Sequence, residues 1–441
     1  MSAQSLAAWW GLISGARWFG GKGRSASLTA VTPLPWLTPA GSLPRVRGEI
    51  ATITYAEGRT EQYLLLAGYT ANPEAPVVTT VADPEHGTLS VVEAPGDPGC
   101  VRALLTALVD PAHPAMQWVD ASAIDPSEPT TIWPGEQSNT TLCLGDHHML
   151  KLFRRLEAGR NLDVEVLAAL NGSGITPALY GTLVGDLPAG ARADLGMFVE
   201  RVQGVEDGWV WACQACAADR DISVEAMQLG AALRAVHERL ASAFGTSVEP
   251  GAEVADQIRL RFDAARAEID ELALIDGAVE STLQALARTD LVTQRVHGDF
   301  HLGQTLRSAN GWTIIDFEGE PLKSLSERRR PDSVWRDVAG MLRSFDYVRA
   351  AHPDPTSAPA AAWSAAARHA FLDGYCQGAS PDSGVLDAYE LDKAVYEVVY
   401  ETRNRPDWAH IPLGAVHNVA RRTAPSPTHD SPSRTHNSKE N

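Results

Sequence analysis

The periodicity of hydrophobic residues changes near residue 205, and this change constrains the fold more than any other feature of the sequence. Before it, apolar and polar residues alternate, as in EIATITYAEG (49–58) and TEQYLLLAGYT (60–70), which predicts strands joined in a hairpin. After it, apolar residues recur at helical spacing, as in VEAMQLGAALRAVHERLASAF (224–244). Strands followed by helices predict an α+β chain with two lobes, linked near residues 200–205.

The composition excludes several classes of function. The chain has 441 residues and a formal net charge of −18, whereas a nucleic-acid-binding protein needs a basic face. No apolar run reaches the roughly 18–20 residues that cross a bilayer, and the first residues do not resemble a signal peptide, so no membrane partner is expected. Only five cysteines occur, which favours the reducing cytoplasm. Of these, Cys213 and Cys216 are expected to pack on a helix rather than to bind zinc.

One hairpin interrupts the helical half of the chain. It runs over RVHGDFHLGQTLRSANGWTIIDFEGEP (295–321) and places Asp299, Gln304 and Asp316 around a short apolar strand. Phosphoryl transfer from ATP needs a carboxylate that orients or deprotonates the attacking hydroxyl, and it needs oxygen ligands for Mg²⁺. Asp299 can supply the first, and Gln304 and Asp316 can supply the second. The hairpin therefore predicts a phosphotransferase, with Gln304 at the position where such loops normally have Asn.

A lysine for the nucleotide phosphates is found upstream of this hairpin. Lys151 lies in the second of two predicted strands, and Glu165 lies on the helix that follows; in this order, an ion pair can steady a phosphate-binding lysine. The loop PGEQSNTT (134–141) precedes the lysine, and its candidate phosphate-binding residues are Ser138, Asn139 and Thr140. An earlier Gly-Gly-Lys-Gly within RWFGGKGR (17–24) lacks the spacing of a P-loop.

Each of these residues also has a purely structural interpretation when it is taken alone. A single lysine on a strand is usually a surface residue, and aspartates often form turns. Lys151, Glu165, Asp299 and Asp316 in the order of a kinase favour catalysis over that interpretation. Their joint presence also disfavours a kinase-like binding protein that has lost its activity. A dehydrogenase would need a glycine-rich turn between a strand and a helix, and the sequence has none.

In combination, the motifs resemble the maltokinase group of the aminoglycoside phosphotransferase-like kinases. The segments that carry the resemblance span about residues 17–413 and are RWFGGKGR, EQSNTTLCLGDHHMLKLFRRLEAGRNLDVEV, VHGDFHLGQTLR, IIDFEGEP, RDVAGMLRSFDY and YEVVYETRNRPDWAHIPL. The resemblance implies a bilobal, protein-kinase-like fold. Its implied parts are an N-terminal cap subdomain (1–90), an intermediate subdomain that completes the N-terminal lobe (91–204) and a mostly α-helical C-terminal lobe (205–420). Residues 421–441 are rich in Ser, Thr and Pro, which predicts a disordered tail.

The resemblance assigns a role to each residue of the phosphoryl-donor side. It makes Asp299 the catalytic base, and it makes Lys151, with Glu165 behind it, the residue that holds the ATP phosphates. The ligands that it implies for Mg²⁺ are Gln304, Asp316 and, as a further carboxylate, Glu318.

The same resemblance implies a hinge and a brace. It places the adenine against the strand MFVERV (197–202), so that Glu200 and Val202 are candidate nucleotide-binding residues. It places Asp337 where an acid braces the catalytic loop. An aspartate at the start of a helix is equally compatible with a purely structural role.

The acceptor side is expected at the end of the helix AVYEVVYETRNRPDW (394–408). Sugars are commonly held by aromatic faces and by hydrogen bonds from carboxylates and arginines, and this helix end offers both. The candidate sugar-binding residues are Asp299, His301, Glu401, Arg405 and Trp408. Tyr396 and Tyr400 fall four residues apart on the same helix, a spacing more typical of packing than of ligand binding.

The resemblance implies transfer of the γ-phosphoryl group of Mg-ATP to a sugar hydroxyl. The low cysteine content favours the cytoplasm, and a monomer is expected. The favoured acceptor is maltose, which gives maltose 1-phosphate. Two features depart from the maltokinase pattern and keep glucosamine, which gives glucosamine 6-phosphate, as the alternative. Ser-Gly-Ala precedes Arg17, and a set of charged residues lies near Glu401. An aminoglycoside is the third candidate, because the maltokinase-like cap argues against it.

Overall fold

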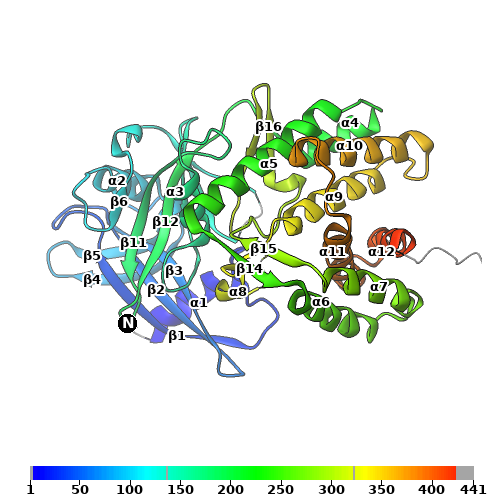
Figure 1. The fold of residues 1–441 in the computed structure, drawn as a ribbon. Coiled ribbons are helices and arrows are strands. Elements are labelled where there is room, and N and C mark those ends of the chain that lie inside the picture. The colour runs from blue at the N-terminus through cyan, green and yellow to red at the C-terminus, as the bar shows by residue number, and fades with distance from the viewer. Residues whose placement is uncertain (1–2, 136–137, 321–322, 424–441) are drawn as a thin grey trace, which may run out of the picture.

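The computed structural model describes residues 3–135, 138–320 and 323–423. Sheets gather at one end of the molecule and helices at the other, with the long helix α5 (Ser223–Phe244) between them (Figure 1). The α+β arrangement that the change of periodicity predicts is confirmed. Within the described ranges, no helix has both the length and the apolar character needed to span a bilayer.

An antiparallel sheet dominates the N-terminal part. Its strands are β1 (Ala26–Trp36), β2 (Arg45–Tyr55), β3 (Thr60–Thr70), β4 (Val77–Asp83) and β5 (Gly87–Glu93), in the order β1-β2-β3-β5-β4, and β10 (Arg155–Leu156) pairs with β3. The hairpin predicted over 49–70 is formed, since Thr54 pairs with Thr60. Helix α1 (Ala3–Gly15), which the periodicity did not predict, buries Trp9 and Ile13 against this sheet in a hydrophobic core of its own.

A second antiparallel sheet follows and carries the predicted lysine. Its strands are β6 (Met116–Trp118), β7 (Thr130–Ile132), β8 (Thr140–Leu144), β9 (His148–Leu152), β11 (Leu179–Asp186) and β12 (Arg192–Glu200), in the order β6-β11-β12-β9-β8-β7. The strand pair predicted around Gly145 is β8 and β9, and Lys151 lies on β9 opposite Met197. Helices α2 (Pro98–Leu108) and α3 (Leu162–Leu170) pack beside the two sheets.

Helices build the rest of the described chain. They are α4 (Gly208–Ala217), α5, α6 (Gly251–Arg266), α7 (Asp276–Leu286), α8 (Leu325–Arg328), α9 (Trp335–Ala350), α10 (Ala358–Cys376), α11 (Ser383–Asn404) and α12 (His410–Thr423). Helix α11 contacts α6, α7, α9 and α12, so it forms the centre of this half. Cys213 and Cys216 lie on α4 as free thiols, as expected.

The end of α12 corrects one boundary. This helix runs to Thr423, so the first residues of the tail predicted over 421–441 are helical and that start point is wrong. The remaining part of the predicted tail, 424–441, lies outside the described residues.

Two small sheets bring the catalytic hairpin into the helical half. One joins β13 (Glu206–Asp207), β16 (Thr305–Ser308) and β17 (Gly311–Ile314), and the other joins β14 (Thr246–Pro250), β15 (Asp290–Gln294) and β18 (Asp332–Ser333). The predicted hairpin is β16 and β17, with Ser308 paired to Gly311 across the turn. Short 3-10 helices complete the chain: η1 (Ala94–Gly96), η2 (Ala121–Ala123), η3 (Asp270–Ile275), η4 (Leu302–Gln304) and η5 (Pro406–Trp408).

Candidate active site

The loop that carries Asp299 is held in place by hydrogen bonds to a buried aspartate. Asp337, in the first turn of α9, accepts hydrogen bonds from the backbone N–H groups of His297 and Gly298, each at 2.8 Å, and from Nε2 of His237 at 2.8 Å. Gly298 has a φ of +87°, a conformation that favours glycine, and it directly precedes Asp299. The predicted bracing role of Asp337 is therefore confirmed by its contacts.

Asp299 has a lysine partner that the sequence analysis did not anticipate. Lys393, on α11, places Nζ 3.3 Å from Oδ1 of Asp299 and 3.6 Å from Oε1 of Glu320. Burial lowers the pKa of Lys393, but the two carboxylates outweigh this effect and raise its pKa above the usual value. The lysine therefore stays charged beside the candidate base. Its spacing was the available sequence signal, since Lys393, Glu397 and Glu401 recur every four residues on α11.

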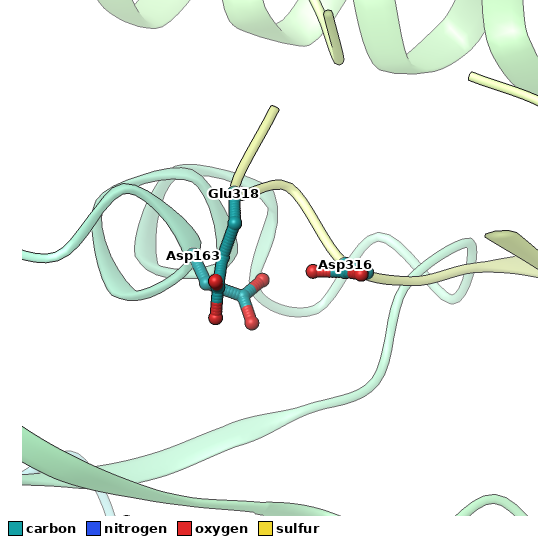
Figure 2. A group of neighbouring side chains, drawn as sticks. All are labelled: Asp163, Asp316 and Glu318. Atoms are coloured by element: carbon teal, nitrogen blue, oxygen red, sulfur yellow. The ribbon is translucent and has the colours of Figure 1, made fainter. Parts of the chain in front are cut away.

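Three carboxylates gather in one place (Figure 2), and two of them contact Lys151. Asp163 comes from α3, and Asp316 and Glu318 come from the segment after β17; their ligand oxygens lie within 4.8 Å of one another. Nζ of Lys151 lies 2.9 Å from Oδ2 of Asp163 and 2.8 Å from Oε1 of Glu318. Burial opposes the charge of Lys151, yet these carboxylates raise its pKa well above the usual value. Burial also raises the pKa of Asp316 to about 6, against the attraction of Lys151.

This cluster fits a divalent cation. Three carboxylates supply the hard oxygen donors that Mg²⁺ prefers, and one lysine does not neutralise them all. Asp316 also has a φ of +64°, a conformation that few residues other than glycine adopt and that often marks a functional site. The residues that would hold Mg²⁺ are Asp316 and Glu318, as the sequence indicated, together with Asp163, which it did not.

The predicted metal ligand Gln304 lies beside this cluster. It ends η4, and its backbone carbonyl accepts a hydrogen bond from the N–H of Ile315 at 3.0 Å. His297 binds the same residue through a contact of 3.0 Å between its Nε2 and the Ile315 carbonyl. These bonds fasten the catalytic loop to the strand that leads into Asp316. The role of the Gln304 side chain stays a prediction.

Lys151 pairs with a different carboxylate from the one predicted. Oε2 of Glu165 lies 3.0 Å from Arg329 and 3.4 Å from Arg295, so the predicted ion pair between Glu165 and Lys151 is wrong. The reason is helical geometry. Asp163 is buried in the first turn of α3 and faces Lys151, whereas a residue two positions later lies about 200° around the helix axis.

Two of the three predicted phosphate-binding side chains in the loop over 134–141 make hydrogen bonds to other residues of the protein. Nδ2 of Asn139 donates to Oε1 of Glu318 at 3.1 Å, and Oγ1 of Thr140 accepts from Nε of Arg154 at 2.7 Å. Ser138 is exposed between the strands. The loop is thus tied to the carboxylate cluster through Asn139.

The N-terminal segment 17–24 reaches the same loop. Arg17 donates to the carbonyl oxygen of Pro134 at 3.1 Å and to that of Gly135. Trp18, the next residue, lies under the guanidinium of Arg154 with 4.9 Å between the charged carbon and the ring centroid. The conspicuous Gly-Gly-Lys-Gly motif therefore follows an anchor that connects the first sheet to the loop ahead of Lys151.

The predicted hinge lies at the end of β12. Oε2 of Glu200 accepts from the N–H of Ala178 at 3.1 Å, which fixes the last residue of this strand. Val202 follows two residues later, and it makes no backbone–backbone hydrogen bond to any residue that the structure describes. The backbone groups of Val202 are thus suited to hydrogen bonds with the adenine of a nucleotide. The nucleotide-binding role of Glu200 and Val202 stays a prediction.

The structure brings three predicted sugar-binding residues into one cluster. Nη2 of Arg405 lies 2.7 Å from Oε1 of Glu401, and its guanidinium lies 5.1 Å from the ring centroid of Trp408. Tyr347 of α9, which the sequence analysis missed, donates to Oε1 of Glu401 at 3.1 Å and stacks on Trp408 at 6.2 Å. Oε2 of Glu401 is buried and has no hydrogen-bond partner among the residues described, which leaves an acceptor for a ligand.

Two tyrosines connect this cluster to Lys393. Tyr396 and Tyr400 stack with ring centroids 6.4 Å apart; Lys393 lies against the first ring at 5.4 Å and Arg405 against the second at 5.6 Å. Tyr400 is 40% exposed, and the interpretation of the two tyrosines as packing residues stays a prediction.

His301 lies close to Asp299, as expected. Its Nδ1 accepts from the N–H of Gly303 at 3.1 Å and so caps η4. Burial lowers the pKa of His301, although the charge of Asp299 opposes this effect. Its contact with a sugar stays a prediction.

Comparisons with known proteins agree with this geometry. Residues 131–389 match the model of the phosphotransferase enzyme family. A glucosamine kinase of Streptacidiphilus jiangxiensis is 30% identical over 316 residues, which cover 63% of this chain and 70% of that protein. A glucosamine kinase of Mycolicibacterium smegmatis is 26% identical over 357 residues, which cover 73% of this chain and 88% of that protein.

A solved structure shares the fold. It is a glucosamine kinase in complex with glucosamine, ADP and inorganic phosphate, with 23% identity and a TM-score of 0.67 over 93% of this chain and 99% of that one. The predicted fold class and the predicted class of enzyme are confirmed. By its sequence match and by the site that its fold assembles, this chain belongs to the phosphotransferase enzyme family.

Proposed function

We propose that this protein is a Mg-ATP-dependent glucosamine kinase that forms glucosamine 6-phosphate. The observation that carries the proposal is the hairpin of β16 and β17, which holds Asp299 on one side and the carboxylates of Asp316 and Glu318 on the other. Transfer of a phosphoryl group to a hydroxyl needs both groups at one place. The choice of glucosamine as the sugar rests on the relatives named above.

The donor-side residues divide the work as follows. Lys151 neutralises the phosphates of ATP, and the hinge at Glu200 and Val202 receives the adenine. Asp316, Glu318 and Asp163 would hold Mg²⁺, which neutralises charge on the transferred group when it is bound. Asp163 and Glu318 also pair with Lys151, so the lysine for the phosphates and the carboxylates for the metal lie side by side.

On the acceptor side, Asp299 accepts the proton of the attacking 6-hydroxyl. Lys393 holds the carboxylate in place from α11 and prevents it from turning away from the substrate. The loop itself is fixed through Asp337, so the base is oriented from two directions before the sugar binds.

The choice of glucosamine over maltose rests on two considerations. The curated relatives described above are glucosamine kinases, so the comparisons favour the alternative acceptor of the sequence analysis over its first choice. The acceptor cluster also contains the buried Oε2 of Glu401, which has no hydrogen-bond partner within residues 3–135, 138–320 and 323–423. A carboxylate oxygen is a suitable partner for an ammonium group.

An assay of ATP consumption with glucosamine, maltose, glucose and kanamycin in parallel tests this function. We expect turnover of glucosamine and a product with phosphate on the 6-hydroxyl, which ³¹P NMR would identify. The Asp299→Asn variant is the control for contaminating kinases. Turnover of maltose without glucosamine would contradict the acceptor and leave the donor side intact.

The proposal includes a cytoplasmic monomer. All five cysteines are free, as is usual in a reducing compartment. Size-exclusion chromatography with light scattering should give a mass close to the chain mass of 47.3 kDa. A mass near twice this value would contradict the monomer.

A further inference from the structure

Under the function proposed above, on which this inference rests, a positively charged sugar meets an anionic base. Glucosamine carries an ammonium group on C2 and the reacting hydroxyl on C6, at opposite ends of the pyranose ring. A carboxylate accepts hydrogen bonds from hydroxyl groups and, more strongly, from cations. Asp299 therefore attracts both ends of the sugar, whereas only the orientation with the 6-hydroxyl at Asp299 leads to phosphoryl transfer.

The carboxylate of Asp299 is accessible and has a cation beside it. The side chain of Asp299 is 21% exposed and that of Lys393 is 17% exposed, with 3.3 Å between Oδ1 and Nζ. Both charged groups thus reach the space in which the acceptor must lie. A ligand that approaches the base therefore meets the positive charge of Lys393 together with the negative charge of Asp299.

The other carboxylate beside Lys393 has further cations close to it. Nζ of Lys393 lies 3.6 Å from Oε1 of Glu320, which is farther than its distance from Asp299. Oε2 of Glu320 lies 2.8 Å from Nζ of Lys323, and its Oε1 lies 3.9 Å from Nη1 of Arg336. The charge of Glu320 is thus shared among three cations. The charge of Lys393 is therefore left mainly for Asp299 and for a group that binds next to it.

Helix α11 continues from Lys393 toward the acceptor cluster as an aromatic surface. Nζ of Lys393 lies 5.4 Å from the ring centroid of Tyr396, and Tyr396 stacks on the exposed ring of Tyr400. Glu401 follows on the same helix, eight positions after Lys393, so roughly 12 Å of helix separates their backbones. A sugar that lies along this surface points one end at the base and the other toward Glu401.

We propose that Lys393 selects the orientation in which glucosamine binds, because its charge repels the substrate ammonium from Asp299. An ammonium group next to Asp299 would lie beside a fixed cation, and like charges at such short distances disfavour each other. The 6-hydroxyl carries no net charge, so it meets no such repulsion and can still donate its hydrogen bond to Asp299. Lys393 is thus a positioning residue that acts on the sugar as well as on the base.

Lys393→Met tests this role, since methionine keeps much of the length of lysine without its charge. Calorimetry without nucleotide should show that the variant binds glucosamine about tenfold more tightly than the wild type, because the ammonium can now pair with Asp299. The affinity for glucose, which has a hydroxyl in place of the ammonium, should not change. The loss of an ordinary contact would weaken binding, so tighter binding of the charged sugar alone is specific to the proposed role.

Steady-state kinetics show how the tighter binding affects turnover. Binding in an unproductive orientation lowers KM and kcat together. In Lys393→Met we expect the KM for glucosamine to fall about tenfold, in line with the affinity. Its kcat should fall by more than this, since the base is also held less firmly. Lys393→Arg keeps the charge and should retain the wild-type affinity and KM for glucosamine.

Arg259→Met is the matched control, because it also removes a cation from an ion pair, here with Glu280 between α6 and α7. It should change neither the affinity nor the rate, and thermal melts should show that every variant is folded. The proposal is overturned if Lys393→Met binds glucosamine no more tightly than the wild type, or if glucose gains as much affinity. The proposed function fails separately, if the wild type does not phosphorylate glucosamine.

Discussion

The donor half and the acceptor half of the active site differ in how completely the protein satisfies its own side chains. In the donor half, Lys151 forms ion pairs with Asp163 and Glu318, and Asn139 donates a further hydrogen bond to Glu318. In the acceptor half, Oε2 of Glu401 is buried without a partner among the described residues, and Tyr400 is exposed. The charged side chains of the donor half are therefore paired with one another, whereas the acceptor half has a buried acceptor atom that no described residue satisfies.

The largest expected effect is at the residue where the two halves meet. Asp299→Asn removes the base while it preserves the shape of the side chain, and general-base catalysis is commonly worth 10²–10⁴-fold. We expect kcat to fall by about 10³-fold, with ATP binding nearly unchanged by calorimetry. Asp290→Asn, an exposed aspartate on β15, is the matched control. A variant within tenfold of the wild type would remove Asp299 from the role of base.

The next largest effect separates the two carboxylates of α3. Asp163→Asn should lower kcat/KM for ATP about 100-fold, because it removes a partner of Lys151 and a member of the carboxylate cluster. Glu165→Gln should change it less than threefold, since Glu165 contacts Arg295 and Arg329 instead. Steady-state kinetics with varied ATP measure both. The opposite ranking would restore the pairing that the sequence alone suggested.

That pairing shows where prediction from the sequence ends. The order of a strand with Lys151, a helix with acidic residues and a hairpin with Asp299 and Asp316 was enough to predict the donor half. The rotation of α3 about its axis was not predictable, because it depends on which face packs into the core. The sequence therefore assigned to Glu165 the contact with Lys151 that Asp163 makes, two residues earlier on the same helix.

In the donor half, a pH dependence of stability is expected from Asp316. Burial raises the pKa of Asp316 to about 6 in the folded state, above the ordinary value of 3.8, so the folded state binds this proton more tightly than the unfolded state. The resulting stabilisation is present below about pH 4 and is lost as the pH rises through 6. At pH 8, Asp316→Asn should be about 2 kcal/mol more stable than the wild type without Mg²⁺.

Urea denaturation in the presence of a chelator measures this difference. The advantage of Asp316→Asn should disappear at about pH 3, where the wild-type carboxyl is protonated in the folded state and mostly protonated in the unfolded state. A constant difference at both pH values would mean that packing rather than charge is responsible. The same variant should be inactive, which would separate stability from function at this residue.

A smaller effect is expected where α11 supports the base. Lys393→Met removes the ion pair with Asp299 and with Glu320, and we expect kcat/KM for the sugar to fall about tenfold. Lys393→Arg keeps the charge and should recover part of the loss. If both variants lose the same amount, size rather than charge matters at this position.

The acceptor half was predicted only in part, for a physical reason. Glu401, Arg405 and Trp408 could be chosen because they are close in the sequence at the end of one helix. Tyr347 belongs to α9, and its bond to Glu401 depends on how α9 and α11 pack, which local spacing does not reveal. Contacts between distant helices were thus missed.

The smallest expected effect concerns the C-terminal residues, which include the end of α12. Removing residues 424–441 should change neither the melting temperature nor the rate. Removing 421–441 also deletes Arg422, which contacts Glu390 at 2.6 Å, and Glu390 is 4% exposed. This second truncation should lower the melting temperature by a few degrees, because a buried carboxylate loses one of two guanidinium partners. We expect the KM for ATP to stay constant in both truncations, and a rise would show that the two halves are coupled through α11.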